Sequence, residues 1–374
     1  MEMVRIAAIS DMHLGAPTSY LTVESVRQRL LRSVVDHAKG HLDLLVLVGD
    51  VIDLTVGRAP EPWVAAREFF AWMGTWPVDI GRIVYIPGNH DHHVWVMLAE
   101  YMEVLSKIGS LASTPVGGEN TNPLLGTAYP FWTPMHNLFP RELSEKVVFA
   151  YPFFYFPETI TDTRFVFHHG HYFDRQITPL AGFAGKRYRS LAKIEAFNLP
   201  YIESLYYLCS WDPLVQKTEL FFYDAMVNGR LSLPGRTAEL FNRILGGRGK
   251  QLGGCDLRQI DRMMEWIGFK SAQLRANDIW VFGHTHICDE YPSSVAPKAL
   301  RLFDLGGWLL NHNPSFGNAG AWSSPAIFYW DEKSGPSLDK IQILEEEKQS
   351  VSVRVTPLAS PNWLRRLLTK VVWQ

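Results

Sequence analysis

The sequence predicts an α/β protein with a layered and largely parallel sheet. Short aliphatic and β-branched runs recur without polar alternation, which is typical of strands buried on both faces. Helical patterns separate the early runs, so we expect parallel crossover connections. Five of the runs end in polar residues of catalytic type. In open α/β sheets the functional site lies beyond the carboxyl ends of the strands.

Six apolar runs are expected to form the strands. They lie within residues 3–13, 42–53, 82–91, 163–171, 278–286 and 300–307. The first five end in Asp-x-His, Gly-Asp-x-x-Asp, Gly-Asn-His-Asp, His-His-Gly-His and Gly-His-x-His, in that order. We therefore expect these polar residues at one edge of the sheet.

Two helices are expected between the early strands. In 24–38 an apolar residue recurs every four positions on one face, at Val26, Leu30, Val34 and Ala38. In 61–73, Pro62 stands in the first turn, where proline is tolerated.

The middle of the chain does not continue this alternation of strands and helices. Residues 121–160 are rich in proline and aromatic residues, and we expect an irregular excursion beside the site. Residues 175–275 have helical patterns without a strand and motif unit. We interpret them as a helical insertion, or cap, over the site within a single domain of residues 1–374.

The last residues, 360–374, form an amphipathic pattern that predicts a C-terminal helix. Its apolar side carries Trp363 and several aliphatic residues, and its other side carries Arg365, Arg366 and Lys370. Such a helix can lie in a membrane interface or dock on its own domain. We expect docking, and peripheral membrane contact is the alternative.

Composition indicates a globular protein of a reducing compartment. Of the 374 residues, 47% are hydrophobic and 20% are charged, which argues against disorder. The net charge of −2 offers no general basic surface for nucleic acid. The three cysteines are distant and odd in number, and no run approaches the ~18 apolar residues of a membrane span. We therefore expect a cytoplasmic protein without a signal peptide, soluble or peripheral at the inner face of a membrane.

The histidines are unevenly distributed. Nine of the thirteen fall in four short stretches, at positions 13, 90–93, 168–171 and 284–286, beside aspartates and an asparagine. Imidazole with carboxylate and amide oxygens is a ligand set for Mn, Fe or Zn rather than for calcium. Asp11 and His13 are two residues apart, so in an extended segment both would point to one side. No motif contains cysteine, which argues against a structural zinc site.

This ordered set of motifs resembles that of the calcineurin-like metallophosphoesterases. The resemblance covers roughly residues 1–110 and 160–310 and implies a two-sheet α/β sandwich, flanked by helices, with two metal ions at one edge. It implies that Asp11, His13 and His286 bind the first ion. It implies that Asn89, His169 and His284 bind the second and that Asp50 bridges both. Mn²⁺ is the expected metal, with Fe or Zn as alternatives.

The resemblance also implies a reaction. A hydroxide between the two metals would attack phosphorus, and both ions would stabilise the developing charge. His90 would act as an acid or charge stabiliser beside the leaving oxygen, and Asp53 would orient it. The motif that begins at Asp50 lacks the following arginine of the protein serine/threonine phosphatases, which argues against that branch.

Four other histidines have less defined expectations. His168 is expected to face the opposite side of its strand in a structural role. His171 would lie on the side of His169 if the strand stays extended, and could support a ligand or touch substrate. His92 and His93 open the next helix and are expected on its face or at the rim.

The expected substrate is a phosphorylated small molecule or a lipid-linked one. The layout resembles that of the UDP-2,3-diacylglucosamine pyrophosphohydrolases, although those carry arginine at the position of His90 and aspartate at that of His171. Lys186, Arg187 and Arg189 are candidate contacts to a diphosphate or carboxylate, or residues of a solvated helix face. The alternatives are a nuclease or nucleotide phosphodiesterase, and a non-catalytic interaction module on the same fold.

Overall fold

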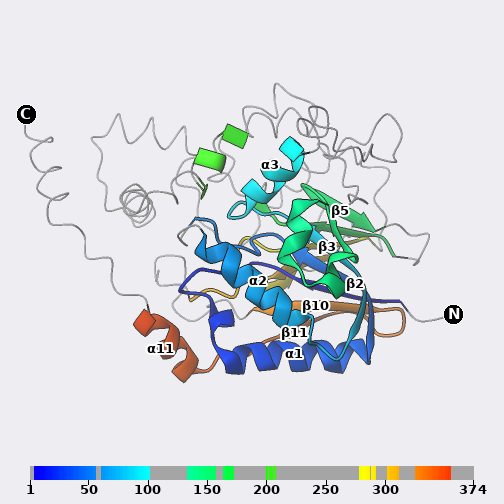
Figure 1. The fold of residues 1–374 in the computed structure, drawn as a ribbon. Helices are drawn as coiled ribbons and strands as arrows, with labels where there is room; N and C mark the ends of the chain where they lie inside the picture. Colours follow the sequence, from blue (N-terminus) through cyan, green and yellow to red (C-terminus); the bar gives the residue numbers. More distant parts are fainter. Residues whose placement is uncertain are drawn as a thin grey trace, which may run out of the picture.

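The computed structural model describes eleven segments of the protein, which form two β-sheets with helices packed around them (Figure 1). These segments are residues 4–55, 60–101, 133–156, 163–171, 199–200, 202–204, 206–207, 278–286, 288–291, 301–310 and 325–354. Within them, no helix is long and apolar enough to cross a membrane.

The first sheet has six strands in the order β11-β10-β1-β2-β3-β4. Strands β1 to β4 are mutually parallel, and β10 and β11 extend the sheet antiparallel to their neighbours. Their bounds are β1 Arg5–Ile9, β2 His41–Val48, β3 Asp79–Ile86, β4 Val147–Phe149, β10 Ala326–Asp331 and β11 Gly335–Lys340.

The second sheet has five strands in the order β5-β6-β7-β9-β8. Strands β6, β7 and β9 are parallel, and β5 and β8 close the two edges antiparallel. Their bounds are β5 Phe153–Phe156, β6 Phe165–His168, β7 Ile279–Phe282, β8 Cys288–Tyr291 and β9 Arg301–Leu305. The parallel centre of each sheet brings the carboxyl ends of its strands to one edge.

The core explains why the strand sequences are apolar without alternation. In β1, Ile6 and Ala8 belong to a cluster shared with the second sheet, which includes Phe165 and Val281. Ala7 lies on the opposite face, in a cluster that includes residues of the helices. Both faces of the strand are buried, as the runs predict. The two-sheet sandwich expected from the sequence is therefore confirmed.

The helices cover the outer face of the six-stranded sheet and its carboxyl edge (Figure 1). Helices α1 and α2 have the bounds expected from the sequence. The described helices are η1 Tyr20–Thr22, α1 Glu24–Ala38, α2 Glu61–Met73, α3 His92–Glu100, η4 Pro134–Leu138, α5 Arg141–Ser144 and α11 Glu345–Arg354. Helix α11 is held to α1 by Glu347, whose buried carboxylate accepts hydrogen bonds from Ser25 and Arg29.

The expectation for residues 121–160 is wrong where the structure describes them. Residues 133–156 contain η4, α5, β4 and β5 rather than an irregular excursion. Strand β4 pairs with β3, and β5 pairs with β6, so this part contributes an edge strand to each sheet. Of the expected insertion, the structure describes only residues 199–200, 202–204 and 206–207, and the tail 360–374 lies outside the described residues.

Candidate metal centre

The candidate ligands lie on loops that leave the carboxyl ends of strands in both sheets. The loop after β1 is bonded to the loop after β2, since the amides of Asp11 and His13 donate to the carbonyls of Gly49 and Asp50 at 3.0 and 2.8 Å. Across the second sheet, the amide of Gly283 donates to the carbonyl of His169 at 2.9 Å. These backbone bonds hold the loops together independently of any ion.

The backbone of these loops is not extended. Asp11, His13, Asp50, His284 and His286 all have positive φ, between 46° and 72°. This left-handed region is uncommon for residues other than glycine. The expectation that Asp11 and His13 share one side of an extended segment is therefore wrong, because β1 ends at Ile9 and the chain turns at each of these residues. Their proximity comes from the turn.

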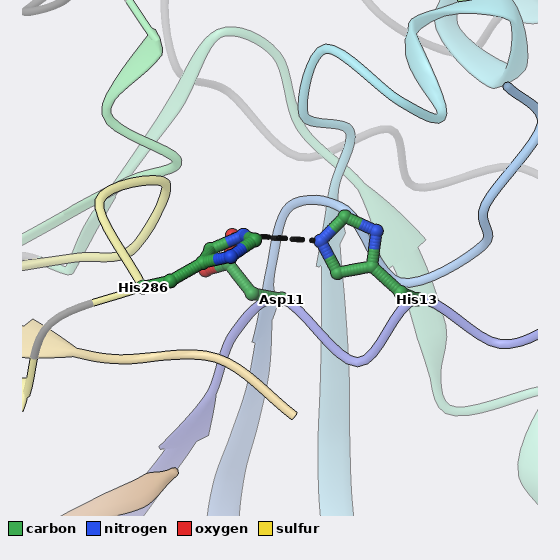
Figure 2. Close-up of side chains that lie close together, drawn as sticks. All are labelled: Asp11, His13 and His286. Atoms are coloured by element: carbon green, nitrogen blue, oxygen red, sulfur yellow. Dashed lines mark hydrogen bonds and ion pairs between the residues drawn. The ribbon is translucent and has the colours of Figure 1, made fainter. Parts of the chain in front are cut away.

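One group of donors consists of Asp11, His13 and His286 (Figure 2). The Nε2 atoms of the two imidazoles lie 3.2 Å apart, and Nε2 of His286 lies 3.1 Å from Oδ1 of Asp11. Asp11 is fixed by the amide of His284, which donates to its carboxylate at 2.9 Å. The three side chains come from loops of both sheets and converge on one point.

A second group consists of Asp50, His169 and His284. Nε2 of His169 lies 3.2 Å from Oδ2 of Asp50 and 3.0 Å from Oδ1 of Asn89. Oδ1 of Asp50 accepts a hydrogen bond from the amide of His90 at 2.7 Å. Asn89 adds an amide oxygen to this group, as the sequence motif suggests.

The spacing of the imidazole nitrogens in the first group fits the ligation of one transition-metal ion. Two nitrogen donors at about 2.0–2.1 Å from one ion lie roughly 3.0–3.4 Å apart for octahedral to tetrahedral angles. The 3.2 Å between His13 and His286 falls in that range. A third group, Asp50 with His13 and His90, overlaps both. The structure therefore holds candidate ligand groups for a dinuclear centre, with Asp50 between them.

The electrostatics of the site depend on the buried carboxylates. Burial opposes ionisation of Asp50, but the neighbouring His169 and His90 hold its pKa well below the usual range. Burial likewise disfavours the charged form of His169, but Asp50 and Asp11 raise its pKa to about 9. Without a metal, protons on imidazoles neutralise the carboxylates. A bound cation would take over that role.

Asp53 contacts two histidines rather than one. Its Oδ2 accepts a hydrogen bond from Nδ1 of His13 at 2.9 Å, and its Oδ1 lies 3.4 Å from Nδ1 of His90. Burial opposes ionisation of Asp53, but His90 and His13 lower its pKa well below the usual range. Burial also opposes protonation of His90, yet Asp50 and Asp53 raise its pKa to about 9. Asp53 thus orients a candidate ligand as well as His90.

Asp91 is a supporting residue that the motif contains but to which sequence reasoning assigned no role. Its buried carboxylate accepts hydrogen bonds from the hydroxyl of Tyr85 at 2.6 Å and from the amide of Gly88 at 2.5 Å. It also accepts from the amides of Asp50 and Val51 at 3.2 and 2.9 Å. Burial and Asp50 raise the pKa of Asp91 to about 6. Its position in the Gly-Asn-His-Asp motif is the only sequence signal.

Asp304 supports the other side of the centre and was also missed. It is buried near the end of β9, and its carboxylate accepts from the hydroxyl of Thr285, between His284 and His286, and from the amide of Gly306. Burial raises the pKa of Asp304 well above its usual range. The signal in the sequence was weak, because Asp304 is followed by Leu305 and two glycines rather than by further polar residues.

The other four histidines of the motif stretches lie in two places. His168 ends β6 and is buried, and His171 is buried as well, with ring centroids 5.7 Å apart. Burial lowers the pKa of both imidazoles well below the usual range. The strand does not stay extended to His171, because Gly170 has φ +114°. His92 and His93 open α3, where both contact Glu203.

Lys186, Arg187 and Arg189 lie outside the described residues.

Imidazole and carboxylate donors gathered at one edge of an α/β sandwich define a class of metal-dependent enzyme. The family model for calcineurin-like phosphoesterases matches residues 4–288, and the chain belongs to that family. The protein is accordingly a metal-dependent phosphoester hydrolase. Among curated proteins, none matches the chain.

Three solved structures are similar to this chain. A conserved Streptococcus pneumoniae protein, described as a predicted phosphoesterase, is 11% identical over 88% of this chain and 84% of its own, with a TM-score of 0.25. A dimetal phosphatase from Danio rerio is 13% identical over 91% and 99%, with a TM-score of 0.35. The inner membrane complex anchor GAP50 of Plasmodium is 9% identical over 94% of each chain, with a TM-score of 0.38.

Proposed function

We propose that the protein is a two-metal hydrolase of phosphoester or pyrophosphate bonds. Asp11, His13 and His286 hold the first ion, and Asn89, His169 and His284 hold the second. Asp50 is shared between them. The observation that carries this proposal is the position of Asp50, whose Oδ2 lies 3.8 Å from Nε2 of His13 and 3.2 Å from Nε2 of His169. Two cations close together repel unless an anion lies between them.

The bound ions supply an activated water and positive charge for the phosphoryl oxygens. The side chains of the protein position the metal ligands and supply the proton for the leaving oxygen. Asp50 sets the spacing of the two donor groups, and the amide of His90 fixes one of its oxygens. Asp53 and Asp91 hold the loops so that these donors need no rearrangement when substrate binds.

His90 is the proposed acid. Its Nδ1 faces Asp53 at 3.4 Å, which leaves Nε2 to donate a proton to the leaving oxygen. In the metal-free protein, Asp50 and Asp53 raise the pKa of this imidazole to about 9 against the effect of burial. The side chain is 22% exposed, so it can meet a substrate.

The types of donor atom indicate which metal binds, and the residues around the centre indicate which substrate is bound. Imidazole, carboxylate and amide oxygen suit Mn²⁺, with Fe and Zn as alternatives. The resemblance to UDP-2,3-diacylglucosamine pyrophosphohydrolases suggests a diphosphate that joins a nucleotide to an acylated sugar. Residues 206–207 of the insertion contact His90 and His93, which supports a substrate that passes beneath the insertion.

A substrate panel tests the reaction. In Mn²⁺, the panel contains a UDP-sugar lipid, aryl monoesters and diesters, cyclic nucleotides and single-stranded DNA. We expect hydrolysis of diesters or diphosphates, and preference for the lipid would support the pyrophosphohydrolase assignment. Preference for DNA or cyclic nucleotides would favour the nuclease or nucleotide phosphodiesterase alternative.

A single substitution tests the bridging role. Asp50→Asn removes the shared charge, and we expect turnover of an aryl phosphodiester to fall by at least about 10³-fold, because both ions lose a ligand. Asp36→Asn, an exposed change on α1, is the matched control. Full activity of Asp50→Asn with folded protein would refute the proposal.

A further inference from the structure

A short part of the insertion is anchored to the first turn of α3. Glu203 lies opposite two successive histidines, and its carboxylate oxygens accept hydrogen bonds from Nδ1 of His92 and Nδ1 of His93, each at 2.6 Å. One carboxylate thus spans two adjacent side chains. Glu203 is largely buried, with 12% of its side chain exposed, so these bonds are little weakened by solvent.

Two further contacts fix the same segment. The rings of His93 and Tyr207 stack, with centroids 3.4 Å apart and an angle of 9° between their planes. On the other side, the hydroxyl of Thr55 donates to the backbone carbonyl of Tyr206 at 2.9 Å. Thr55 is two residues beyond Asp53, and its amide donates to Oδ1 of that carboxylate at 3.0 Å. The segment is therefore tied to α3 and to the loop that carries Asp53.

The consequence is that the ring of Tyr206 lies against His90. Their centroids are 5.0 Å apart, at an angle of 51°, and Tyr206 is 6% exposed. The ring of His13 contacts His90 edge-on at 4.7 Å from another direction. Asp53 lies beside Nδ1, so among the described residues Asp53, His13 and Tyr206 surround this imidazole, and of these three Tyr206 belongs to the insertion.

We propose that Tyr206 is a positioning residue for His90 and that Glu203 holds Tyr206 in place. The inference rests on the proposed function, in which His90 protonates the leaving oxygen. Asp53 orients the imidazole through its contact with Nδ1, and Tyr206 restricts the rotation of the ring. A displacement of about 1 Å in a reacting group can cost up to ~10²-fold in rate. The insertion thereby acts on the chemical step as well as covering the site.

A double-mutant cycle between Tyr206→Leu and His90→Ala tests the positioning role. The substrates are aryl phosphodiesters whose phenols differ in acidity, because an acid matters most when the leaving group is poor. We expect His90→Ala to slow poor leaving groups more than good ones. Tyr206→Leu should do the same, by about tenfold in kcat for the poorest phenol, with little change in KM. Tyr206→Phe keeps the ring and should restore the wild-type profile.

The double variant carries the decisive comparison. If Tyr206 acts through His90, the double variant should be no slower than His90→Ala, because the two changes disrupt one unit. Equal slowing by Tyr206→Leu in both backgrounds, or equal slowing of good and poor leaving groups, would overturn the positioning role. An unchanged leaving-group profile for His90→Ala would refute the role of His90 itself, and the inference with it. The metal content of each variant distinguishes both outcomes from loss of the metal centre.

A second variant tests the anchor with a readout besides activity. Glu203→Gln weakens the two bonds to His92 and His93, and Glu100→Gln, exposed at the end of the same helix, is the matched control. We expect faster amide exchange at Tyr207, whose amide donates to the carbonyl of Glu203 at 3.1 Å. The leaving-group profile should shift toward that of Tyr206→Leu. Unchanged exchange and an unchanged profile would overturn the anchoring role.

Discussion

Five of the candidate ligands hold backbone conformations that favour glycine. Each such residue costs of order 1–3 kcal/mol, so the surrounding hydrogen bonds must impose them. The amides of Asp11 and His13 donate to the neighbouring loop, which fixes both turns. The donors are therefore arranged before an ion arrives, which lowers the reorganisation needed on binding.

Gly49 gives a test of that arrangement. It has φ +75°, and an added Cβ would lie 2.3 Å from the ring of His169. We expect Gly49→Ala to destabilise the fold by about 3 kcal/mol or more and to displace His169, because strain and overlap act together. Gly335 has φ +72° with nothing near its Cβ, so Gly335→Ala should show the backbone strain alone, at about 1 kcal/mol. Urea unfolding and metal content measure both, and equal effects would contradict the overlap.

The raised pKa of His169 predicts proton release on metal binding. Burial opposes its charge, but Asp50 and Asp11 raise the pKa to about 9, so the metal-free protein holds this proton at pH 7. A ligand imidazole must be neutral, so apparent affinity should rise about tenfold per pH unit for each proton displaced. The rise should end above about pH 9.

Titration calorimetry in two buffers of different ionisation enthalpy measures the release. We expect at least about one proton per chain at pH 7 and fewer at pH 9.5. Binding enthalpies that do not depend on the buffer at pH 7 would contradict the assignment.

Sequence reasoning could name most residues of the candidate site. It could not name the contacts that hold these residues in position. Histidines and aspartates at strand ends are visible as a pattern, and the family resemblance singles out Asp50 and His169 among them. Asp91 could not be given a role, because its partners are mostly backbone amides that only the fold brings together. The second contact of Asp53, with His13, depends on a left-handed turn that side-chain spacing does not encode.

At the scale of helices and strands, the agreement between prediction and structure depended on the length and the burial of each element. Helices α1 and α2 were predicted with their observed bounds, because their amphipathic patterns are long. The central strands were predicted, since both of their faces are apolar. Strands β4 and β5 were missed, because they are three and four residues long in a proline-rich region.

Asp91 joins two of these elements, the loops after β2 and β3, and its loss should separate them. Asp91→Asn places an amide donor among amide and hydroxyl donors, and we expect at least about 2–3 kcal/mol of destabilisation with weaker metal binding. Tyr85→Phe removes a single donor at 2.6 Å and should cost about 1 kcal/mol. Denaturant unfolding of the metal-free proteins, with metal titration, measures both. A larger effect for Tyr85→Phe would show that the loops do not depend on Asp91.

At the scale of the whole molecule, the candidate centre connects the two sheets. His13 follows a strand of the first sheet, and His286 follows a strand of the second, 273 positions later. An ion held by both would join the sheets at their shared edge. The sandwich was predictable from the family resemblance, whereas most of the expected insertion lies outside the described residues.

Metal removal should therefore lower the stability of the folded chain. Free metal at one hundred times Kd stabilises a protein by about 2.7 kcal/mol per site if it binds only the native state. We expect a chelator to lower Tm and added Mn²⁺ to restore it. In Asp50→Asn, Tm should respond weakly to metal. A Tm that is the same with and without chelator would contradict a centre that spans both sheets.

The separation of His13 and His286 along the chain also bears on how the protein is made. The N-terminal part of a chain leaves the ribosome first. Asp11, His13, Asp50 and Asn89 emerge early, but neither donor group is complete until His284 and His286 have been synthesised. A nascent chain that stops before β7 lacks the imidazoles of His284 and His286, so we expect neither ion to be fully ligated until the loop after β7 has been made.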